Sequence, residues 1–383
     1  MKYPGLRSVV ALAGMIAGAV SIAACGQTSA APSGVARAPL QPPGYVVAVP
    51  VPQVMTSPVV RPPQQLADRV SNLIRAFGGK AGVGIRAVDE GWTVEAGGRQ
   101  RLPQQSVSKL WVAITLLDQR DRGLVRMDDP IVVRTQDLTL FHQPIAALVK
   151  GDGYHTTVGE LMRRALTMSD NTANDRLLSL VGGPMAVREM IAAKQLGDIR
   201  FGPGERLLQS YTAGVTWNQA MAMGRGFEAA RARLDPAVRR AAFERYVADP
   251  IDGAAPLAIA DALARLARGE LLSETSTRLL LDTMAASHTG RARLRAVVPT
   301  DWQIAHKTGT GQELGSRNAG LNDVGLLTAP DGRRYAVAVM IGDTTHTMRE
   351  RQQLIQAVGA ALIGGHALSP TMAATSGDEE AGS

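Results

Sequence analysis

Three short motifs in the chain combine residue types that can carry out nucleophilic catalysis. A serine hydroxyl is a poor nucleophile until a neighbouring base takes its proton, and a buried lysine, or a carboxylate acting through water, can serve as that base. Any one such motif arises by chance, so the ordered set carries the interpretation. In chain order the motifs are Ser106-Val107-Ser108-Lys109, Ser169-Asp170-Asn171 and Lys307-Thr308-Gly309.

The first motif lies where a serine can be activated. The apolar run 110–117 suits a helix buried at the centre of a domain, and Ser106 precedes that run. Lys109 is one turn further along, on the same face and within reach of the serine oxygen. The N-terminus of such a helix places positive potential where an oxyanion would form. We therefore predict Ser106 as the nucleophile and Lys109 as part of the activating group.

The ordered motifs resemble those of the class A serine β-lactamases, in the superfamily of β-lactamases and penicillin-binding transpeptidases. The resemblance extends from about residue 66 to residue 362, and segments 165–173 and 307–311 are similar to the family's second and third active-site segments. It implies hydrolysis of β-lactam amides through a Ser106 acyl-enzyme, without metal or organic cofactor. The expected substrate is a β-lactam or a peptidoglycan-like small molecule.

The resemblance also implies a role for each residue of the motifs. The backbone N–H groups of Ser106 and Thr310 form the oxyanion hole, and Ser169 relays a proton to the leaving nitrogen. Asn171 binds the substrate's side-chain amide. The substrate's carboxylate is held by Lys307, Thr308 and Gly309, with Arg317 as an auxiliary arginine. The alternative for Arg317 is a solvated strand residue.

Water attack on the acyl-enzyme distinguishes a β-lactamase from a penicillin-binding protein. The family uses a Glu-x-x-Leu-Asn segment for this step, and this chain has Glu205-Arg-Leu-Leu-Gln209. We expect Glu205 to act as the base and Gln209 to position the water, although Glu205 could also be an exposed loop carboxylate. Asp175 replaces the asparagine that usually bonds the loop glutamate, and it would face Glu205 with like charge unless one carboxyl is protonated.

Two other functions remain open at this point. The first is a penicillin-binding D,D-peptidase or esterase on the same fold, which would be acylated readily and deacylated slowly. The second is a non-catalytic lipoprotein that binds cell-wall fragments. The complete set of Ser106, Lys109, Ser169 and Lys307 argues against the second, because a binding module does not need it.

Three further side chains near the motifs have less certain roles. Phe141 or His142 lies where the family carries an aromatic gate beside the pocket. His306, next to Lys307, is interpreted as a packing residue, since the family's chemistry needs no histidine there.

The elements that must position these residues are strands at both ends of the chain around a helical middle. We expect an α/β (α+β) fold in which an antiparallel sheet is flanked by N- and C-terminal helices, with an inserted all-helical lobe. Helical spacing begins at Leu66 and ends at Gly78-Gly79, and a closing amphipathic helix carries Leu354 to Leu362. The expected strands are 82–88, 92–96, 302–307, 320–327 and 335–342.

The segment 216–252 is longer than the family's usual connection between the glutamate loop and the next helix, which should start near Pro256. Its pattern predicts one or two amphipathic helices packed on that loop. It is either a surface elaboration or a lid that shapes access to the substrate.

Composition places the chain in the ordinary globular class, with 45% hydrophobic and 20% charged residues. Its net charge of +7 is scattered, and no pattern of basic and aromatic residues indicates binding to nucleic acid. We expect a monomer whose catalytic domain spans 66–365.

The N-terminus predicts export and attachment to a membrane. Residues 1–25 combine a basic start, an apolar stretch and small residues before Cys25, the only cysteine, and resemble a lipoprotein signal with Cys25 as the lipidated residue. The alternative is a plain signal peptide. Residues 26–65 are proline-rich and suit a tether, and 366–383 suit a disordered tail. We expect a periplasmic, lipid-anchored protein, and Gly26 favours the outer membrane.

Overall fold

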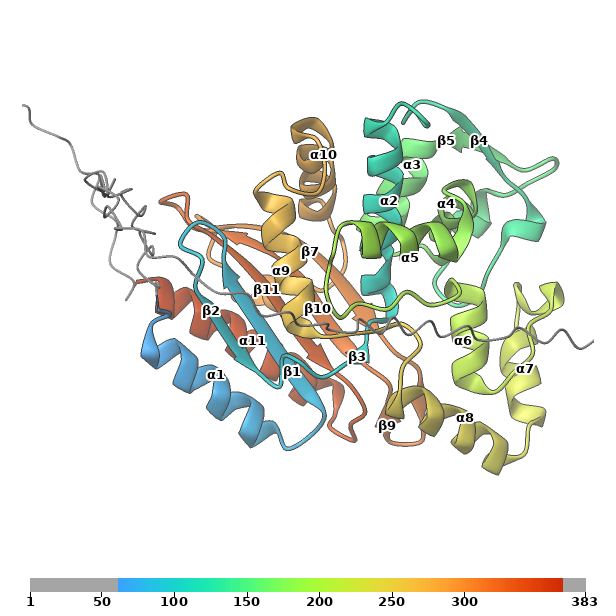
Figure 1. The fold of residues 1–383 in the computed structure, drawn as a ribbon. Coiled ribbons are helices and arrows are strands. Elements are labelled where there is room, and N and C mark those ends of the chain that lie inside the picture. The colour runs from blue at the N-terminus through green and yellow to red at the C-terminus, as the bar shows by residue number, and fades with distance from the viewer. Residues whose placement is uncertain (1–60, 368–383) are drawn as a thin grey trace, which may run out of the picture. The chain divides into compact units, whose positions relative to one another are not determined.

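The computed structural model describes residues 61–367, in which an antiparallel sheet lies beside a lobe of helices (Figure 1). The predicted signal segment with Cys25, most of the tether and nearly all of the tail lie outside the described residues. Within them, no helix is both long enough and apolar enough to cross a membrane.

The sheet has five strands in the order β2-β1-β11-β10-β7, and every neighbouring pair is antiparallel. β1 pairs with β11 from Ala81 opposite Ile341 to Ala87 opposite Tyr335, so the two ends of the domain meet at its centre. The strands are β1 (Ala81–Ala87), β2 (Thr93–Ala96), β7 (Gln303–Thr310), β10 (Leu321–Thr328) and β11 (Arg334–Ile341).

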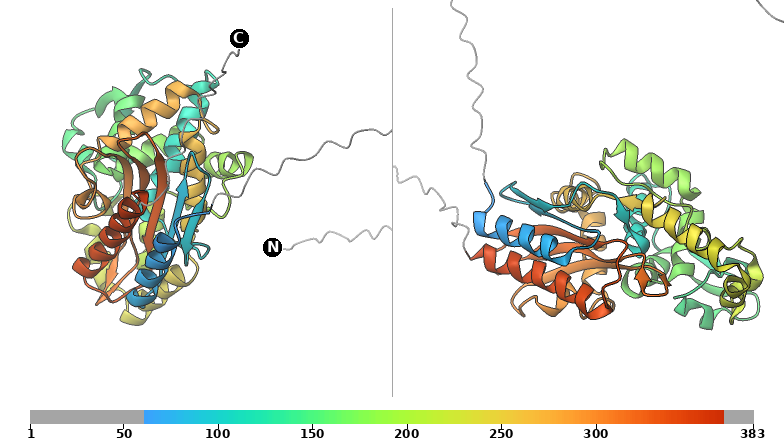
Figure 2. Two further views of the ribbon diagram at one scale, coloured as in Figure 1. Left: turned by 90° about the vertical axis from the view of Figure 1, so that its left-hand side faces the viewer. Right: turned by 90° about the horizontal axis from the view of Figure 1, so that it is seen from below.

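Both faces of the sheet are covered by helices, which explains the nearly continuous apolar sequence of β11. Successive side chains of a strand point to opposite faces, and those of β11 alternate between two hydrophobic cores. Val337 and Val339 pack toward α1 (Gln64–Phe77) and α11 (Met348–His366), which lie side by side in Figure 2. Ala336, Ala338 and Met340, which point to the other face, pack toward the helical lobe.

The helical lobe is organised around α2 (Lys109–Asp121), whose residues 109–117 are all buried. This all-round burial agrees with the absence of a polar face in that run. The other helices that lie between β2 and β7 in the sequence are α3 (Val158–Arg163), α4 (Asn171–Leu180), α5 (Gly183–Ala193), α6 (Glu205–Ala213), α7 (Gly226–Arg233), α8 (Pro236–Ala248), α9 (Pro256–Ala267) and α10 (Glu274–Ala285). Of these, α9 packs directly on β1 and β11 of the sheet, and α10 packs on β7.

Short two-stranded pairs connect these parts. They are β3 (Leu102–Pro103) with β6 (Gly253–Ala254), β4 (Pro130–Val133) with β5 (Tyr154–Thr157), and β8 (Glu313–Leu314) with β9 (Arg317–Asn318). The β3–β6 pair joins the segment just before the nucleophile to the end of the long segment 216–252.

The expected fold class is confirmed: an antiparallel sheet is flanked by the first and last helices, and a helical lobe is inserted. All five expected strands form; four lie within one residue of their predicted bounds, and β7 continues three residues beyond its predicted end. The segment 216–252 holds α7 and α8, and α9 begins at Pro256.

Candidate active site

The predicted nucleophile Ser106 lies in a single 3₁₀ turn, Gln105–Ser108, that leads directly into α2. This turn places the half-buried Ser106 at the helix N-terminus and Lys109 one turn later. The Lys109 Nζ donates a hydrogen bond to Ser106 Oγ at 2.6 Å. The contact expected from the Ser-x-x-Lys spacing is therefore formed.

Lys109 joins three functional groups. Its side chain is buried, and its Nζ donates to Asn171 Oδ1 at 2.8 Å and to the carboxylate of Glu205, as well as to Ser106. An ammonium group has three hydrogen atoms to donate, so these contacts use all of them. A buried pair of opposite charges is stabilised only when its remaining hydrogen bonds are satisfied, as they are for this lysine.

Glu205 is buried at the first turn of α6, only 3% exposed, so it is not the exposed loop carboxylate of the alternative interpretation. Asp175, from α4, accepts hydrogen bonds from the backbone N–H groups of Glu205 at 2.8 Å and Arg206 at 3.2 Å. The aspartate thus holds the start of α6 by its backbone. Burial, and next the charge of Glu205, raise the pKa of Asp175 to about 6.

Gln209 reaches Glu205 despite its extra methylene group. Its Nε2 lies 3.4 Å from Glu205 Oε2 and 3.3 Å from Gln105 Oε1, and its Oε1 accepts from Gln312 Nε2 at 2.9 Å. The amide is held on both sides, beside the carboxylate that we expect to act on water.

The second and third motifs are in direct contact with each other. Lys307 Nζ donates to Ser169 Oγ at 2.9 Å. Ser169 has a left-handed φ of 59°, which turns its side chain out of the preceding helical segment. Burial, followed by the charge of Lys109, lowers the pKa of Lys307 well below its ordinary value. Asp170 has a structural role: it caps α4 and accepts the Ile145 N–H at 2.7 Å.

The strand β7 forms one wall of the site, and Gly309 allows it to lie close to the nucleophile turn. A Cβ atom at position 309 would be 2.4 Å from the backbone oxygen of Gln104. Thr308 and Thr310, on either side of it, line the cavity.

These groups surround a cavity of about 440 Å³, which is large enough for a small ligand. Lys109 and Lys307 lie behind its wall and reach it through their hydrogen bonds to Ser106 and Ser169. The lining residues are Ser106, Phe141, His142, Ser169, Asn171, Glu205, Gln209, Thr289, Arg293, Thr308, Thr310, Gly311 and Gln312.

Arg317 does not line this cavity, which argues against its predicted role as the auxiliary carboxylate-binding arginine. It lies on the separate β8–β9 hairpin rather than on the sheet strand that follows Lys307. Its guanidinium group pairs with Asp343 at 2.6 Å and with Glu244 at 3.5 Å, and it stacks over the Phe243 ring.

Arg293 is the arginine that lines the cavity, and the sequence analysis missed it. It donates to Thr310 Oγ1 at 2.6 Å, Gly309 O at 2.9 Å and Asn322 O at 2.7 Å. These contacts hold its guanidinium beside the Lys-Thr-Gly strand. The available signal was the run Arg291-Ala-Arg-Leu-Arg295 before β7, but the run does not reveal which arginine turns inward.

The less certain side chains are also placed. Phe141 and His142 both line the cavity, and the Phe141 ring meets Phe227 of α7 edge-on at 5.0 Å. His306 is fully buried, and its Nδ1 is 2.8 Å from Asp323 Oδ1, which agrees with the packing interpretation.

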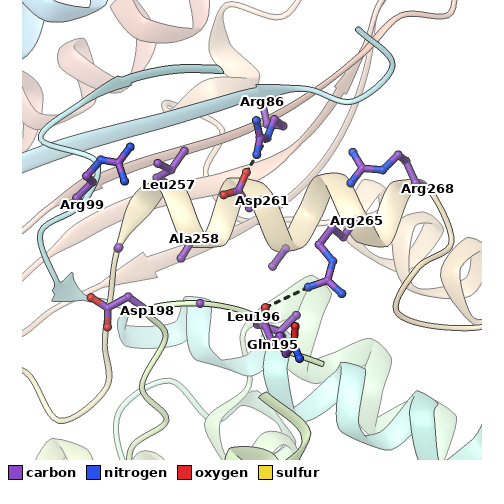
Figure 3. A pocket seen from close by; sticks show the side chains of 13 residues that line it. Arg86, Arg99, Gln195, Leu196, Asp198, Leu257, Ala258, Asp261, Arg265 and Arg268 are labelled. Atoms are coloured by element: carbon purple, nitrogen blue, oxygen red, sulfur yellow. Dashed lines mark hydrogen bonds and ion pairs between the residues drawn. The ribbon is translucent and has the colours of Figure 1, made fainter. Parts of the chain in front are cut away.

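A second cavity, of about 470 Å³, lies between α9, the edge of the sheet and the loop after α5 (Figure 3). Four arginines and two aspartates line it, and no serine, threonine, cysteine, lysine or histidine does. Its arginines already have partners: Arg86 pairs with Asp261 at 2.7 Å, and Arg265 donates to Gln195 O at 3.1 Å. Of these two cavities, only the first is lined by Ser106, the predicted nucleophile.

Comparisons with known proteins agree with this site. The model of the beta-lactamase enzyme family matches residues 65–365. The extended-spectrum beta-lactamase PER-1 of Pseudomonas aeruginosa is 27% identical over 294 residues, covering 76% of this chain and 84% of that protein.

Two solved structures share the fold over nearly their whole length. A beta-lactamase from Chitinophaga pinensis is 26% identical with a TM-score of 0.65, covering 79% of this chain and 99% of that structure. The ancestral class A beta-lactamase GNCA is 28% identical with a TM-score of 0.63, covering 78% and 99%. With the family model matching most of its length, the chain belongs to the beta-lactamase enzyme family and is a serine β-lactamase of the class A type.

Proposed function

We propose that Ser106 forms the acyl-enzyme with a β-lactam and that Glu205 activates the water that hydrolyses it. One observation carries this proposal: Lys109 Nζ contacts the nucleophile, the substrate-binding Asn171 and the carboxylate of Glu205 at once. Nucleophile and base are therefore linked through one buried amine.

In acylation, the Lys109 ammonium group releases a proton to solvent, and the freed amine takes the proton of Ser106. The Ser106 oxygen then forms a bond to the lactam carbonyl carbon. The carbonyl oxygen accepts hydrogen bonds from the backbone N–H groups of Ser106 and Thr310. The lactam C–N bond breaks as its nitrogen takes the Ser169 hydroxyl proton. Lys307, which donates to Ser169, replaces that proton, and its lowered pKa supports this transfer.

The substrate's carboxylate is held at the β7 wall. We propose that Lys307, Thr308 and Gly309 bind it together with Arg293, which takes the part first given to Arg317. The support is that Arg293 donates to Thr310 Oγ1 and Gly309 O beside the cavity. A guanidinium fixed by backbone oxygens can meet a carboxylate with little loss of side-chain entropy.

In deacylation, Glu205 takes a proton from water, whose oxygen forms a bond to the acyl carbon. The ester bond to Ser106 breaks, and the serine oxygen recovers its proton from Lys109. Glu205 then passes its proton to Lys109, and Lys307 recovers one from solvent, which restores the starting protonation states. Gln209 supports this step because its amide is bonded to Glu205 and to Gln312.

The test is to mix the purified domain with a chromogenic cephalosporin and to follow turnover together with the mass of the intact protein. Steady turnover with a transient adduct is the expected result. A long-lived stoichiometric adduct would indicate a penicillin-binding protein. Absence of any adduct would contradict the proposal that Ser106 forms an acyl-enzyme.

We also propose that the enzyme acts in the periplasm, attached through lipid on Cys25. The sequence of residues 1–25 and the proline-rich segment after it support this proposal. Gly26 favours the outer membrane over the inner one.

A further inference from the structure

A buried tyrosine of the long segment 216–252 reaches the residue that precedes the nucleophile. Tyr246, on α8, is fully buried, and its hydroxyl accepts a hydrogen bond from Gln105 Nε2 at 2.6 Å. The same hydroxyl donates to Asp252 Oδ1 at 3.0 Å. Burial raises the pKa of Tyr246 well above its ordinary value, so the hydroxyl stays protonated and remains a donor.

Asp252 holds the backbone of Gln105 directly and its side chain through Tyr246. Its Oδ2 accepts the Gln105 backbone N–H at 2.8 Å, while its Oδ1 accepts the Tyr246 hydroxyl. Gln105 has a left-handed φ of 53°, a conformation that costs a non-glycine residue energy and persists only when its surroundings hold it. The aspartate and tyrosine supply such surroundings directly before Ser106.

A continuous chain of hydrogen bonds connects Tyr246 with Glu205, and its donors start at Gln209, which donates to Glu205 on one side and to Gln105 on the other. Because Gln105 Nε2 points to Tyr246, its Oε1 faces Gln209 Nε2, 3.3 Å away. Gln209 Nε2 in turn faces Glu205 Oε2 at 3.4 Å. If Gln105 turned its amide over, its NH₂ would oppose that of Gln209 and would break this order.

We propose that Tyr246 is a positioning residue for deacylation, acting through Gln105 and Gln209 to hold Glu205 for attack by water. This inference rests on the proposed role of Glu205. It assigns a catalytic purpose to the inserted helix α8, in place of either a surface elaboration or a lid.

These contacts separate the groups that act in acylation from those that act in deacylation. Lys109 contacts Ser106 and one oxygen of Glu205, whereas the chain from Tyr246 ends on the other oxygen. Loss of the Tyr246 hydroxyl therefore leaves the contact between Lys109 and Ser106 in place. It frees the two glutamine amides that border the carboxylate.

The experiment compares acylation and deacylation rate constants of Tyr246→Phe with those of the wild type, using stopped-flow mixing with a chromogenic cephalosporin. We expect acylation within about twofold of the wild type and deacylation slowed by about tenfold or more, the size of one lost hydrogen bond in the transition state. The acyl-enzyme should accumulate by intact mass.

Tyr335→Phe is the matched control. It also removes one buried tyrosine hydroxyl, which lies 2.9 Å from His366 Nδ1 in the core under α1 and α11. It should lower thermal stability without changing either rate constant. If Tyr246→Phe behaves like this control, or slows both steps equally, its positioning role is overturned.

A double-mutant cycle tests the route. In a Gln209→Ala background, Tyr246→Phe should cause little further loss of deacylation, whereas independent effects would multiply and contradict the route. Glu205→Gln, measured alongside, separates the two proposals. Normal deacylation in Glu205→Gln overturns both, while slow deacylation there with normal deacylation in Tyr246→Phe overturns only the role of Tyr246.

Discussion

The carboxylate of Asp175 faces the backbone of Glu205 and accepts its N–H at 2.8 Å. A second N–H, from Arg206, reaches the other oxygen, and the Arg206 guanidinium lies 3.7 Å away. The two oxygens of the Asp175 carboxylate thus accept N–H groups at the N-terminus of α6, which have no acceptor within the helix. The substitution of aspartate for the family's asparagine is accommodated by these donors.

The first prediction concerns the pH dependence of stability. Asp175 has a pKa of about 6 in the folded protein, above the ordinary 3.8, so its folded state binds the proton more tightly. This contribution is greatest below pH 3.8, and about 3 kcal/mol is lost as the pH rises from there through 6. Asp175→Asn cannot titrate, so its free energy of unfolding relative to the wild type should improve over that range.

Urea unfolding at several pH values from 4 to 7 measures this difference. Asp252, whose pKa burial also raises to about 6, is present in both proteins and cancels in the comparison. Asp68→Asn, at an exposed position of α1, is the control and should follow the wild type. A constant offset between Asp175→Asn and the wild type would contradict the raised pKa.

The second prediction concerns the base for deacylation. Glu205→Gln is nearly isosteric but cannot accept a proton, so turnover should fall by about 100-fold or more and the acyl-enzyme should accumulate by mass. Glu228→Gln, on the exposed side of α7, is the control and should turn over normally. Equal turnover in Glu205→Gln and the wild type would place the base elsewhere.

The third prediction concerns the nucleophile. Ser106→Ala removes the oxygen that receives the Lys109 hydrogen bond, and covalent labelling by a fluorescent penicillin should disappear. Ser108→Ala removes a hydroxyl of the same motif that donates to Gln105 O at 2.8 Å, and labelling should persist there. Labelling of folded Ser106→Ala would exclude Ser106 as the acylated residue.

The fourth prediction distinguishes two arginines. Arg293→Ala should reduce kcat/KM for penicillins by about tenfold or more, since a hydrogen bond to a charged group contributes about 1.5 to 3 kcal/mol. Arg317→Ala should leave kcat/KM unchanged and lower stability by less than about 1 kcal/mol, as expected for a partly exposed pair with Asp343. The reverse ranking in steady-state kinetics would restore the original assignment of Arg317.

The fifth prediction concerns attachment to the membrane. Cys25→Ser should release the enzyme from the membrane fraction or leave the precursor unprocessed, because only the cysteine thiol can receive the lipid. Fractionation of cells that express each form measures this. A wild-type enzyme found wholly in the soluble periplasmic fraction would refute the anchor.

The large elements of the fold could be predicted from sequence because their signals are local. The continuous apolar segment of β11 and the amphipathic run of α11 can each be recognised within a short stretch of sequence. The β4–β5 pair was not predicted. Its strands have four residues each and are partly exposed, so their pairing depends on the surrounding helical lobe rather than on their own pattern.

The residues of the site also divide into those that local sequence predicts and those that only the fold brings together. The motif residues were located because their spacing is short and ordered along the chain. Tyr246 and Gln105 are 141 residues apart, and no periodicity connects them before the chain folds. The prediction for Arg317 rested on its nearness to Lys307 in sequence, which does not reveal that Arg317 lies on the β8–β9 hairpin and outside the cavity.

The pairing of β1 with β11 has a consequence for how the enzyme is made. These strands are separated by about 250 residues, and β11 stands between β1 and β10 at the centre of the sheet. Contacts this distant in sequence form late and slowly, so synthesis must pass residue 341 before the sheet can close. A chain cut short before Arg334 would retain every motif residue and the whole helical lobe. It would nevertheless expose two unpaired strand edges and should aggregate rather than yield a partly active enzyme.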